Sequence, residues 1–280
     1  MIGKFKTGPL MSHCRITAVL TAYNSDKTLH KSINSLLSQS HPPDELILVN
    51  DGSTDHTLEV LRAYESRYTN VVVLNPGRIG RAAALNLAVF HATSDFIANQ
   101  DADDVSYPDR LQKQLELLKK NTNFGAVGAG AHIVYGSSEE NFSTRLPSAN
   151  PNKATRSLAK HVPFPHTLAT FRKEAWEEAG GYPDVRYLID YNLWVCMARK
   201  GWRLSNVPEP LGTHYKYESS YWATNFPQRE QQRALARLQS KTIKDLNLPF
   251  WMFFYPFLRY FGSFAPQSLR VFLRRFRNEP

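Results

Sequence analysis

Apolar and polar positions along the first hundred residues follow a pattern typical of strands that alternate with helices. Short apolar runs predict buried strands, and between them apolar positions recur every three or four residues, which predicts helices with one apolar face. The expected strands are 16–20, 46–49, 71–74 and 95–98, and the expected helices are 26–38, 55–67 and 82–90. Such alternation predicts a mostly parallel, Rossmann-like α/β sheet that binds its ligand at the carboxyl ends of the strands.

The pattern after residue 107 is less regular. We expect strands at 125–134 and 168–171, helices at 108–120, 173–179 and 191–200, and a loop with a short helix over 141–165. No run of 18 apolar residues occurs, so no transmembrane helix is expected. The first residues lack the apolar stretch of a secretory signal, and two isolated cysteines favour a reducing, cytoplasmic compartment.

Composition supports a folded protein with an unevenly placed charge. The 280 residues are 42% hydrophobic and 21% charged, which excludes a disordered chain and a disulfide-dependent miniprotein. The net charge is +9, and the last 56 residues carry +7 of it. An anionic partner is therefore expected at the tail rather than on the body.

The tail has two interpretations. Residues 251–261 are very apolar but too short to span a bilayer. After Pro266 the pattern predicts a helix with Leu269, Phe272, Leu273 and Phe276 on one face and arginines around it. The tail either packs on the body, or 251–277 lies in the interface of an anionic membrane as a peripheral contact.

The acidic group of Asp101, Asp103 and Asp104 follows the fourth expected strand. An extended path would place Asp101 and Asp103 on the same side of the backbone, and carboxylates of this kind suit Mg²⁺ or Mn²⁺. The alternative is a solvated acidic turn before the helix that Pro108 opens.

Two loops offer further polar groups. In 50–55, Asp51 could accept hydrogen bonds from a nucleobase or ribose, although an ordinary turn would look the same. In 75–81, two glycines and two arginines suit an anionic ligand or a solvated loop. Neither a Walker A loop nor a dinucleotide-binding glycine motif is present.

The order of these motifs resembles the family 2 glycosyltransferases. It consists of Thr-Ala-Tyr-Asn at 21–24, Asn-Asp-Gly-Ser-Thr-Asp at 50–55, the segment 80–86, Asp-Ala-Asp-Asp at 101–104, Gly-Gly-Tyr at 180–182 and Asp-Tyr-Asn-Leu-Trp at 190–194. The resemblance covers about 15–215. It implies a GT-A fold, a nucleotide-diphosphate sugar donor, a divalent metal and inversion at the anomeric carbon.

The resemblance also implies roles for single residues. Ala22 and Tyr23 match the nucleoside pocket, Asp51 matches the acid that binds the base, and Arg81 lies in the segment that closes over the nucleotide. Asp101 and Asp103 match the metal-binding acids, and Asp190 matches the catalytic base. The residues that match the surroundings of the acceptor are His166, Gly181, Tyr182 and Trp194.

Two departures from the family pattern stand out. Ile189 replaces the first member of the acidic pair that usually precedes the aromatic residue. The family's histidine element after the base is displaced in this chain, with His214, Lys216 and Glu218 near the expected positions. No metal-binding histidine is assigned from the sequence.

From the resemblance we expect an inverting hexosyltransferase. It would move a sugar from a nucleotide-diphosphate sugar, with UDP preferred, to a hydroxyl of a glycan or lipid-linked acceptor in cell-surface polysaccharide or glycolipid synthesis. It would work at the cytoplasmic face of the membrane. Residues 1–110 would bind the donor and 111–220 the acceptor, and 221–280 would form a helical amphipathic tail.

Two other classes compete with this interpretation. A sugar nucleotidyltransferase would need a glycine-rich basic loop after the first strand, where the chain has Tyr-Asn-Ser-Asp at 23–26. A non-enzymatic nucleic-acid-binding protein would account for the basic tail, but such a protein normally has a basic face on its body too. We therefore expect no nucleic-acid partner.

Overall fold

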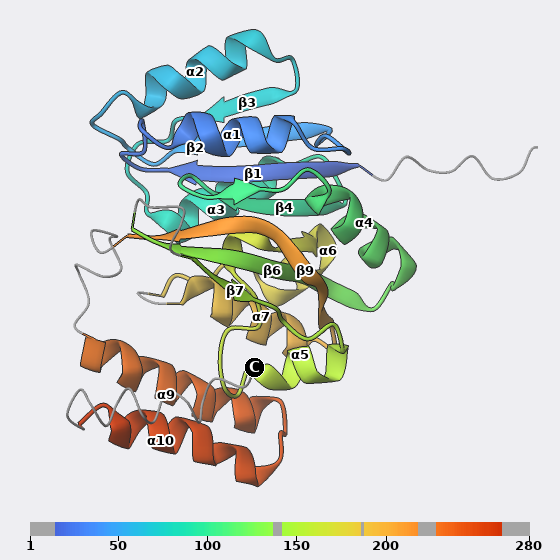
Figure 1. Cartoon of the computed structure of the whole chain (residues 1–280), viewed down its shortest axis with the longest axis vertical. Coiled ribbons are helices and arrows are strands. Elements are labelled where there is room, and N and C mark those ends of the chain that lie inside the picture. The colour runs from blue at the N-terminus through green and yellow to red at the C-terminus, as the bar shows by residue number, and fades with distance from the viewer. Residues whose placement is uncertain (1–14, 137–141, 186–187, 218–227, 265–280) are drawn as a thin grey trace, which may run out of the picture.

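The computed structural model describes residues 15–136, 142–185, 188–217 and 228–264. These residues form one nine-stranded sheet flanked by helices (Figure 1). The strands are β1 (Ile16–Ala22), β2 (Glu45–Asn50), β3 (Val71–Leu74), β4 (Phe96–Asp101), β5 (Val105–Ser106), β6 (Phe124–Tyr135), β7 (Phe142–Arg145), β8 (Thr170–Arg172) and β9 (Arg203–Lys216).

The α-helices and two short 3₁₀ helices fill the intervals between the strands and follow the last one. They are α1 (Leu29–Leu37), α2 (Thr57–Arg67), α3 (Arg81–His91), α4 (Arg110–Lys120), α5 (Pro151–Ser157), η1 (His166–Leu168), α6 (Lys173–Ala179), α7 (Ile189–Arg199), α9 (Gln228–Asp245), η2 (Phe250–Phe253) and α10 (Phe254–Gly262).

The sheet has a parallel part and a mixed part. Its order is β3-β2-β1-β4-β8-β6-β9-β5, with β7 paired to β6. The strands β3, β2, β1 and β4 are all parallel, as the alternating pattern predicts. β8 runs antiparallel to both β4 and β6, and it joins the parallel part to the β6–β9 pair.

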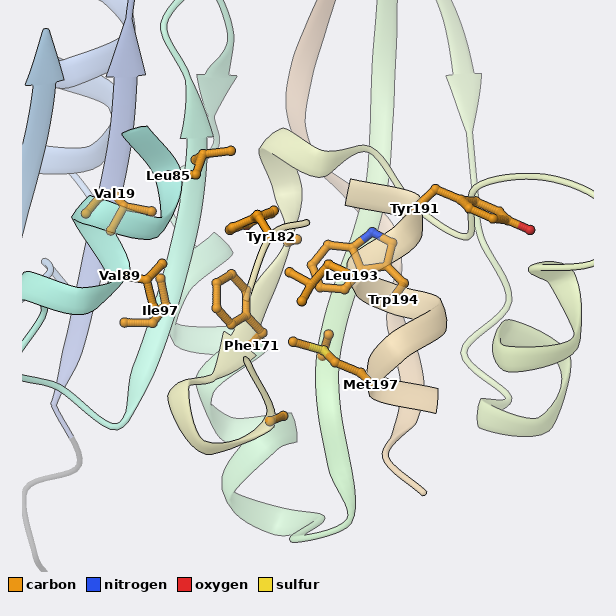
Figure 2. Close-up of a cluster of buried hydrophobic side chains, with 14 of the residues drawn as sticks. Val19, Leu85, Val89, Ile97, Phe171, Tyr182, Tyr191, Leu193, Trp194 and Met197 are labelled. Atoms are coloured by element: carbon orange, nitrogen blue, oxygen red, sulfur yellow. The ribbon is translucent and has the colours of Figure 1, made fainter. Parts of the chain in front are cut away.

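Apolar side chains alternate between the two faces of the central strands. Ala18 and Leu20 of β1 pack with α1 and α2, whereas Val19 belongs to a cluster on the other face. Figure 2 shows this second cluster, in which Val19 lies on the side of α3 and Trp194 on the side of α7. The cluster therefore joins the parallel strands, which are expected to bind the donor, to helices of the part expected to bind the acceptor.

The strand β9 and the short strand β7 are absent from the sequence-based expectation. β9 contains Pro208 and Pro210, which cannot donate to a sheet and argue against an inner strand. The pairing with β6 shifts register between Ala129 and Gly130, so a bulge accommodates the prolines. β7 lies in 141–165, where the sequence predicts a loop with one short helix.

The C-terminal part is a helical pair that exposes aromatic side chains. In Figure 1, α9 and α10 lie side by side, on the opposite side of the molecule from α2. Among the described residues, no helix is long and apolar enough to cross a bilayer. The helix expected after Pro266 lies outside the described residues.

Candidate active site

The candidate site lies at the carboxyl ends of β1, β2 and β4. Ala22 at the end of β1 is level with Asn50 of β2, and Thr21 is level with Asp101 of β4. Because these strands are parallel, the residues that follow them meet at one edge of the sheet. The arrowhead of β1 marks this edge in Figure 1.

Asp51 is buried under the loop that precedes α3. Its Oδ1 accepts the backbone N–H groups of Ile79 at 2.8 Å and Gly80 at 2.9 Å, and its Oδ2 pairs with Arg78. The Arg78 guanidinium lies 3.6 Å from the centroid of the Tyr23 ring, which is 44% exposed. An exposed ring, a planar cation and a carboxylate thus lie together, a set able to bind a nucleobase by stacking and hydrogen bonding.

The backbones of Ala22 and Gly52 hold Asp51 close to the loop that contains Arg78. Ala22 is buried, and its carbonyl accepts the N–H of Asp51 at 2.9 Å. Gly52 has φ +70°, and a Cβ there would lie 2.7 Å from the backbone nitrogen of Arg78. Only glycine lets the two loops approach so closely.

Asp101 is held as a carboxylate by its neighbours. Arg81 Nη2 lies 2.7 Å from Asp101 Oδ1, and His166 Nδ1 lies 3.7 Å from the same oxygen. Burial alone would raise the pKa of Asp101, but the charge of Arg81 outweighs it and holds the pKa well below its usual range. The acid is therefore ionised throughout the physiological pH range.

Asp103 and Asp104 are in the opposite situation. Burial, and then the charges of Asp104 and Asp101, raise the pKa of Asp103 to about 7. Burial raises the pKa of Asp104 as well, although His214 Nδ1 lies 2.8 Å from its Oδ2 and the N–H of Tyr215 donates to its Oδ1 at 2.8 Å. Crowded carboxylates without enough positive charge favour a proton or a cation.

The acidic side chains of this site fit a divalent cation that takes most of its ligands from outside the protein. The oxygens of Asp101 and Asp103 are hard ligands, and the raised pKa of Asp103 reflects the like charges that a cation would relieve. Within the described ranges, no three His, Cys, Asp or Glu side chains converge on one metal position. A Mg²⁺ or Mn²⁺ ion here would complete its coordination with water and the phosphate oxygens of a ligand.

His166 links Asp101 to the interior through a defined tautomer. Arg81 Nη2 at 3.3 Å and Asn99 Nδ2 at 3.0 Å both donate toward His166 Nδ1, so this nitrogen is the acceptor. Nε2 then carries the proton and donates to the Tyr182 hydroxyl at 2.9 Å. The chain of contacts thus runs from Asp101 through Arg81 and His166 to Tyr182.

The backbone of Tyr182 is fixed by Asn86 of α3. Asn86 Nδ2 donates to the Tyr182 carbonyl at 2.8 Å, and the Tyr182 N–H donates to Asn86 Oδ1 at 2.7 Å. Gly181 is buried with φ +77°, and a Cβ there would lie 2.9 Å from Asn86 Oδ1. Gly181 therefore contributes space for this clamp.

Asp190 lies in the first turn of α7 and is half-buried. The pKa of Arg81 is raised by Asp101 first and also by Asp190 and Asp103. Burial, and then Asp190, raise the pKa of Tyr182 well above its usual value. Asp190 thus acts on the same groups as the strand-end acids, while Ile189 packs against the apolar cluster below.

Trp194 supports the site from inside the core. It has no exposed surface, and its ring centroid lies 6.2 Å from that of His166 and 6.0 Å from that of Phe171. In this structure it has no surface to offer an acceptor, because it packs behind His166. Its neighbour one turn on, Met197, is equally buried.

Sequence reasoning gave no specific role to three residues in this network. Arg78 stacks on Tyr23, Asn99 fixes the tautomer of His166, and His214 pairs with Asp104. The two arginines of the loop before α3 indicate an anionic ligand in the sequence, but the family resemblance implies a role for Arg81 alone. His214 reaches Asp104 because β9 returns beside β5, a pairing that the local pattern does not reveal.

Comparisons with known proteins give this arrangement a family. The family described as "Glycosyl transferase family 2" matches residues 17–180. The putative glycosyltransferase EpsE of Bacillus subtilis is 35% identical over 203 residues, which cover 70% of this chain and 71% of EpsE. The chain belongs to glycosyltransferase family 2. The amylovoran biosynthesis glycosyltransferase AmsE of Erwinia amylovora is 30% identical, over 70% of this chain and 74% of AmsE.

Solved structures share the fold of this glycosyltransferase at low sequence identity. Staphylococcus aureus TarS in complex with UDP-GlcNAc superposes with a TM-score of 0.65 at 16% identity, over 91% of this chain and 77% of the TarS chain. The mannosyltransferase PcManGT of Pyrobaculum calidifontis, in complex with GDP-Man and Mn²⁺, gives 0.63 at 21% identity, over 94% and 79%. The fold is therefore of the GT-A type.

Proposed function

We propose that this glycosyltransferase moves a sugar, with inversion, from a nucleotide-diphosphate sugar to an acceptor hydroxyl. The observation that carries the proposal is the contact of Arg81 with Asp101 at 2.7 Å and with His166 at 3.3 Å, which links the end of β4 to Tyr182. Burial, and then Asp190, raise the pKa of Tyr182, so the acid proposed as base lies near this network. UDP is the preferred nucleoside diphosphate in this proposal, and TarS, which binds UDP-GlcNAc, shares the fold.

Asp190 is the proposed general base. A sugar hydroxyl is a weak nucleophile, and a carboxylate in reach of it can accept its proton as it attacks. The Tyr182 hydroxyl, kept protonated by its raised pKa, lies within the electrostatic reach of Asp190. One base that acts opposite the leaving group permits a single displacement, which inverts the anomeric centre.

The leaving group is the nucleoside diphosphate, and the proposed donor side neutralises it. A Mg²⁺ or Mn²⁺ ion held by Asp103 and Asp101 would balance the negative charge that develops on the diphosphate. Arg81, whose side chain is 53% exposed, adds a permanent positive charge beside Asp101. Tyr23 and Asp51 bind the base, so the nucleotide spans the ends of β1, β2 and β4.

The proposed acceptor is a glycan or lipid-linked hydroxyl in cell-surface polysaccharide or glycolipid synthesis. AmsE, which carries amylovoran biosynthesis in its name, supports the polysaccharide class. Residues 1–110 form the proposed donor half and 111–220 the acceptor half, with His166, Gly181 and Tyr182 around the acceptor. The enzyme would work at the cytoplasmic face of the membrane, with 221–280 as its tail.

A thermal-shift screen of nucleoside diphosphates tests the donor side. We expect UDP with Mn²⁺ to raise the melting temperature, and EDTA to abolish the rise. The variant Asp103→Ala should fold but lose the metal-dependent part of the shift, and it should lose transfer. If no nucleoside diphosphate shifts the wild-type protein with either Mn²⁺ or Mg²⁺, the donor proposal is wrong.

The stereochemistry is tested separately on the product. Proton NMR of the transferred sugar should show an anomeric configuration opposite to that of the donor. A product that keeps the donor's configuration would exclude the single displacement with Asp190 as base.

A further inference from the structure

Five phenylalanines of η2, α10 and the turn that follows form one exposed face. Phe250, Phe254, Phe257, Phe261 and Phe264 are spaced alternately by four and three residues, which places them along one side of a helix. Each of them is at least 54% exposed, and Phe250 reaches 85%. We refer to them as the phenylalanine face. Single exposed apolar residues are common, but a continuous row marks an interaction surface.

The opposite side of α10 is firmly docked. Met252, Pro256 and Ser263 are buried. Arg259 donates to Gln239 Oε1 at 3.0 Å and to Gln232 Oε1 at 2.7 Å, both on α9. The helix is therefore fixed on α9 by its inner side, and the phenylalanine face is the side turned away from those contacts.

A row of basic residues on α9 accompanies the phenylalanine face. Arg229, Arg233, Arg237, Lys241 and Lys244 recur every four or three residues, and each is half-buried or exposed. The Arg233 guanidinium lies 4.3 Å from the ring centroid of Phe264, so the two rows meet there. The chain has no Asp or Glu between residues 246 and 278. An apolar row beside a cationic row is complementary to a lipid surface with anionic head groups.

We propose that the phenylalanine face lies in the interface of an anionic bilayer, with the α9 basic row against its head groups. No described helix can span a bilayer, so the pair would lie on the membrane rather than cross it. Two copies of this chain that met through this face would bring their basic rows close together, which like-charge repulsion disfavours.

The surface also fits the proposed acceptor. In Figure 1, the C-terminal end of α10 lies on the same side of the molecule as the carboxyl end of β1. A lipid-linked acceptor would lie in the same bilayer that the phenylalanine face enters. The link to a lipid-linked acceptor rests on the proposed function. The binding of the chain to lipid requires neither donor nor transfer, so it can be tested separately.

Vesicle flotation of the full-length chain tests the proposal. We expect binding to vesicles of phosphatidylcholine and phosphatidylglycerol in equal parts at low salt, weaker binding as salt rises, and little binding to phosphatidylcholine alone. The double variant Phe257→Ser/Phe261→Ser should lose roughly tenfold or more in vesicle affinity, because both rings leave the acyl boundary. The triple variant Arg229→Gln/Arg237→Gln/Lys241→Gln should lose the preference for phosphatidylglycerol.

Phe90→Ser is the matched control, since Phe90 of α3 is 73% exposed but lies outside this surface. It should bind vesicles like wild type. Melting curves and UDP–Mn²⁺ binding should be unchanged in all variants, which separates this test from that of the donor site. Three results would each overturn the proposal: wild type that ignores anionic vesicles at low salt, phenylalanine variants that bind normally, or a wild-type dimer that these variants abolish without any vesicle binding.

Discussion

Asp101 and Asp103 are two residues apart, but their surroundings favour opposite charge states. Asp101 lies against Arg81 and His166, and the charge of Arg81 keeps it ionised. Asp103 has Asp104 and Asp101 as charged neighbours, and with burial they raise its pKa to about 7. The sequence predicts the acidic pair, but it cannot show this difference, because Arg81 and His166 come from distant segments of the chain.

The raised pKa of Asp103 predicts a pH-dependent stability. The folded form holds the proton more tightly than the unfolded chain, whose aspartate pKa is 3.8. The resulting stabilisation is fully present below the unfolded value and is lost as pH rises through about 7. Asp103→Asn removes this loss, so without metal the variant should melt several degrees above wild type at pH 8.

At pH 5 the difference in melting temperature should be smaller, because Asp103 of the wild type is mostly protonated there. Mn²⁺ should stabilise the wild type more at pH 8 than at pH 5, and it should not stabilise Asp103→Asn. Equal melting temperatures of wild type and variant at pH 8 without metal would contradict the crowding of the three acids.

Tyr182 is predicted to position the base side of the site. Tyr182→Phe keeps the ring but leaves His166 Nε2 without its acceptor, 2.9 Å away in the wild type. We expect kcat to fall roughly tenfold, the cost of about one buried hydrogen bond, while UDP binding changes less than twofold. Steady-state kinetics and calorimetry would separate the two. A large loss of UDP affinity with unchanged kcat would assign Tyr182 to the donor side instead.

At the scale of elements, the pattern along the chain predicts regular units better than irregular ones. The strands of the parallel part and the helices between them follow the expected segments, since their apolar periodicity is local. β9 escapes prediction because its two prolines belong to a bulge that only the partner strand β6 explains. The clamp between Asn86 of α3 and the loop after α6 is likewise a contact between distant segments.

Asn86→Ala is predicted to loosen that clamp. It leaves the buried backbone N–H and carbonyl of Tyr182 without partners, which should lower the free energy of unfolding by about 2 kcal/mol. Urea denaturation measures the loss. Ser66→Ala is the control, because the Ser66 hydroxyl bonds the carbonyl of Ala63 within α2. A loss no greater than that of Ser66→Ala would show that the clamp contributes nothing.

At the scale of the whole molecule, the sheet and the C-terminal helices carry the residues of three proposed roles. The parallel half of the sheet presents the acids proposed for the donor, β8 and the following helices present Tyr182 and Asp190, and α9 with α10 adds a cationic and aromatic surface. Family membership and the α/β fold were predictable from the motif order and are confirmed. The roles of individual residues remain predictions. The central one is Asp190 as the base.

The most direct measurement of that claim is transfer by Asp190→Asn with donor binding recorded in parallel. The two side chains have similar shapes, so UDP binding with Mn²⁺ should stay near wild type. Transfer should fall by roughly 100-fold or more, because the amide cannot accept the hydroxyl proton. Turnover near that of wild type would contradict the account and would direct the search for the base to Asp184 or Glu218.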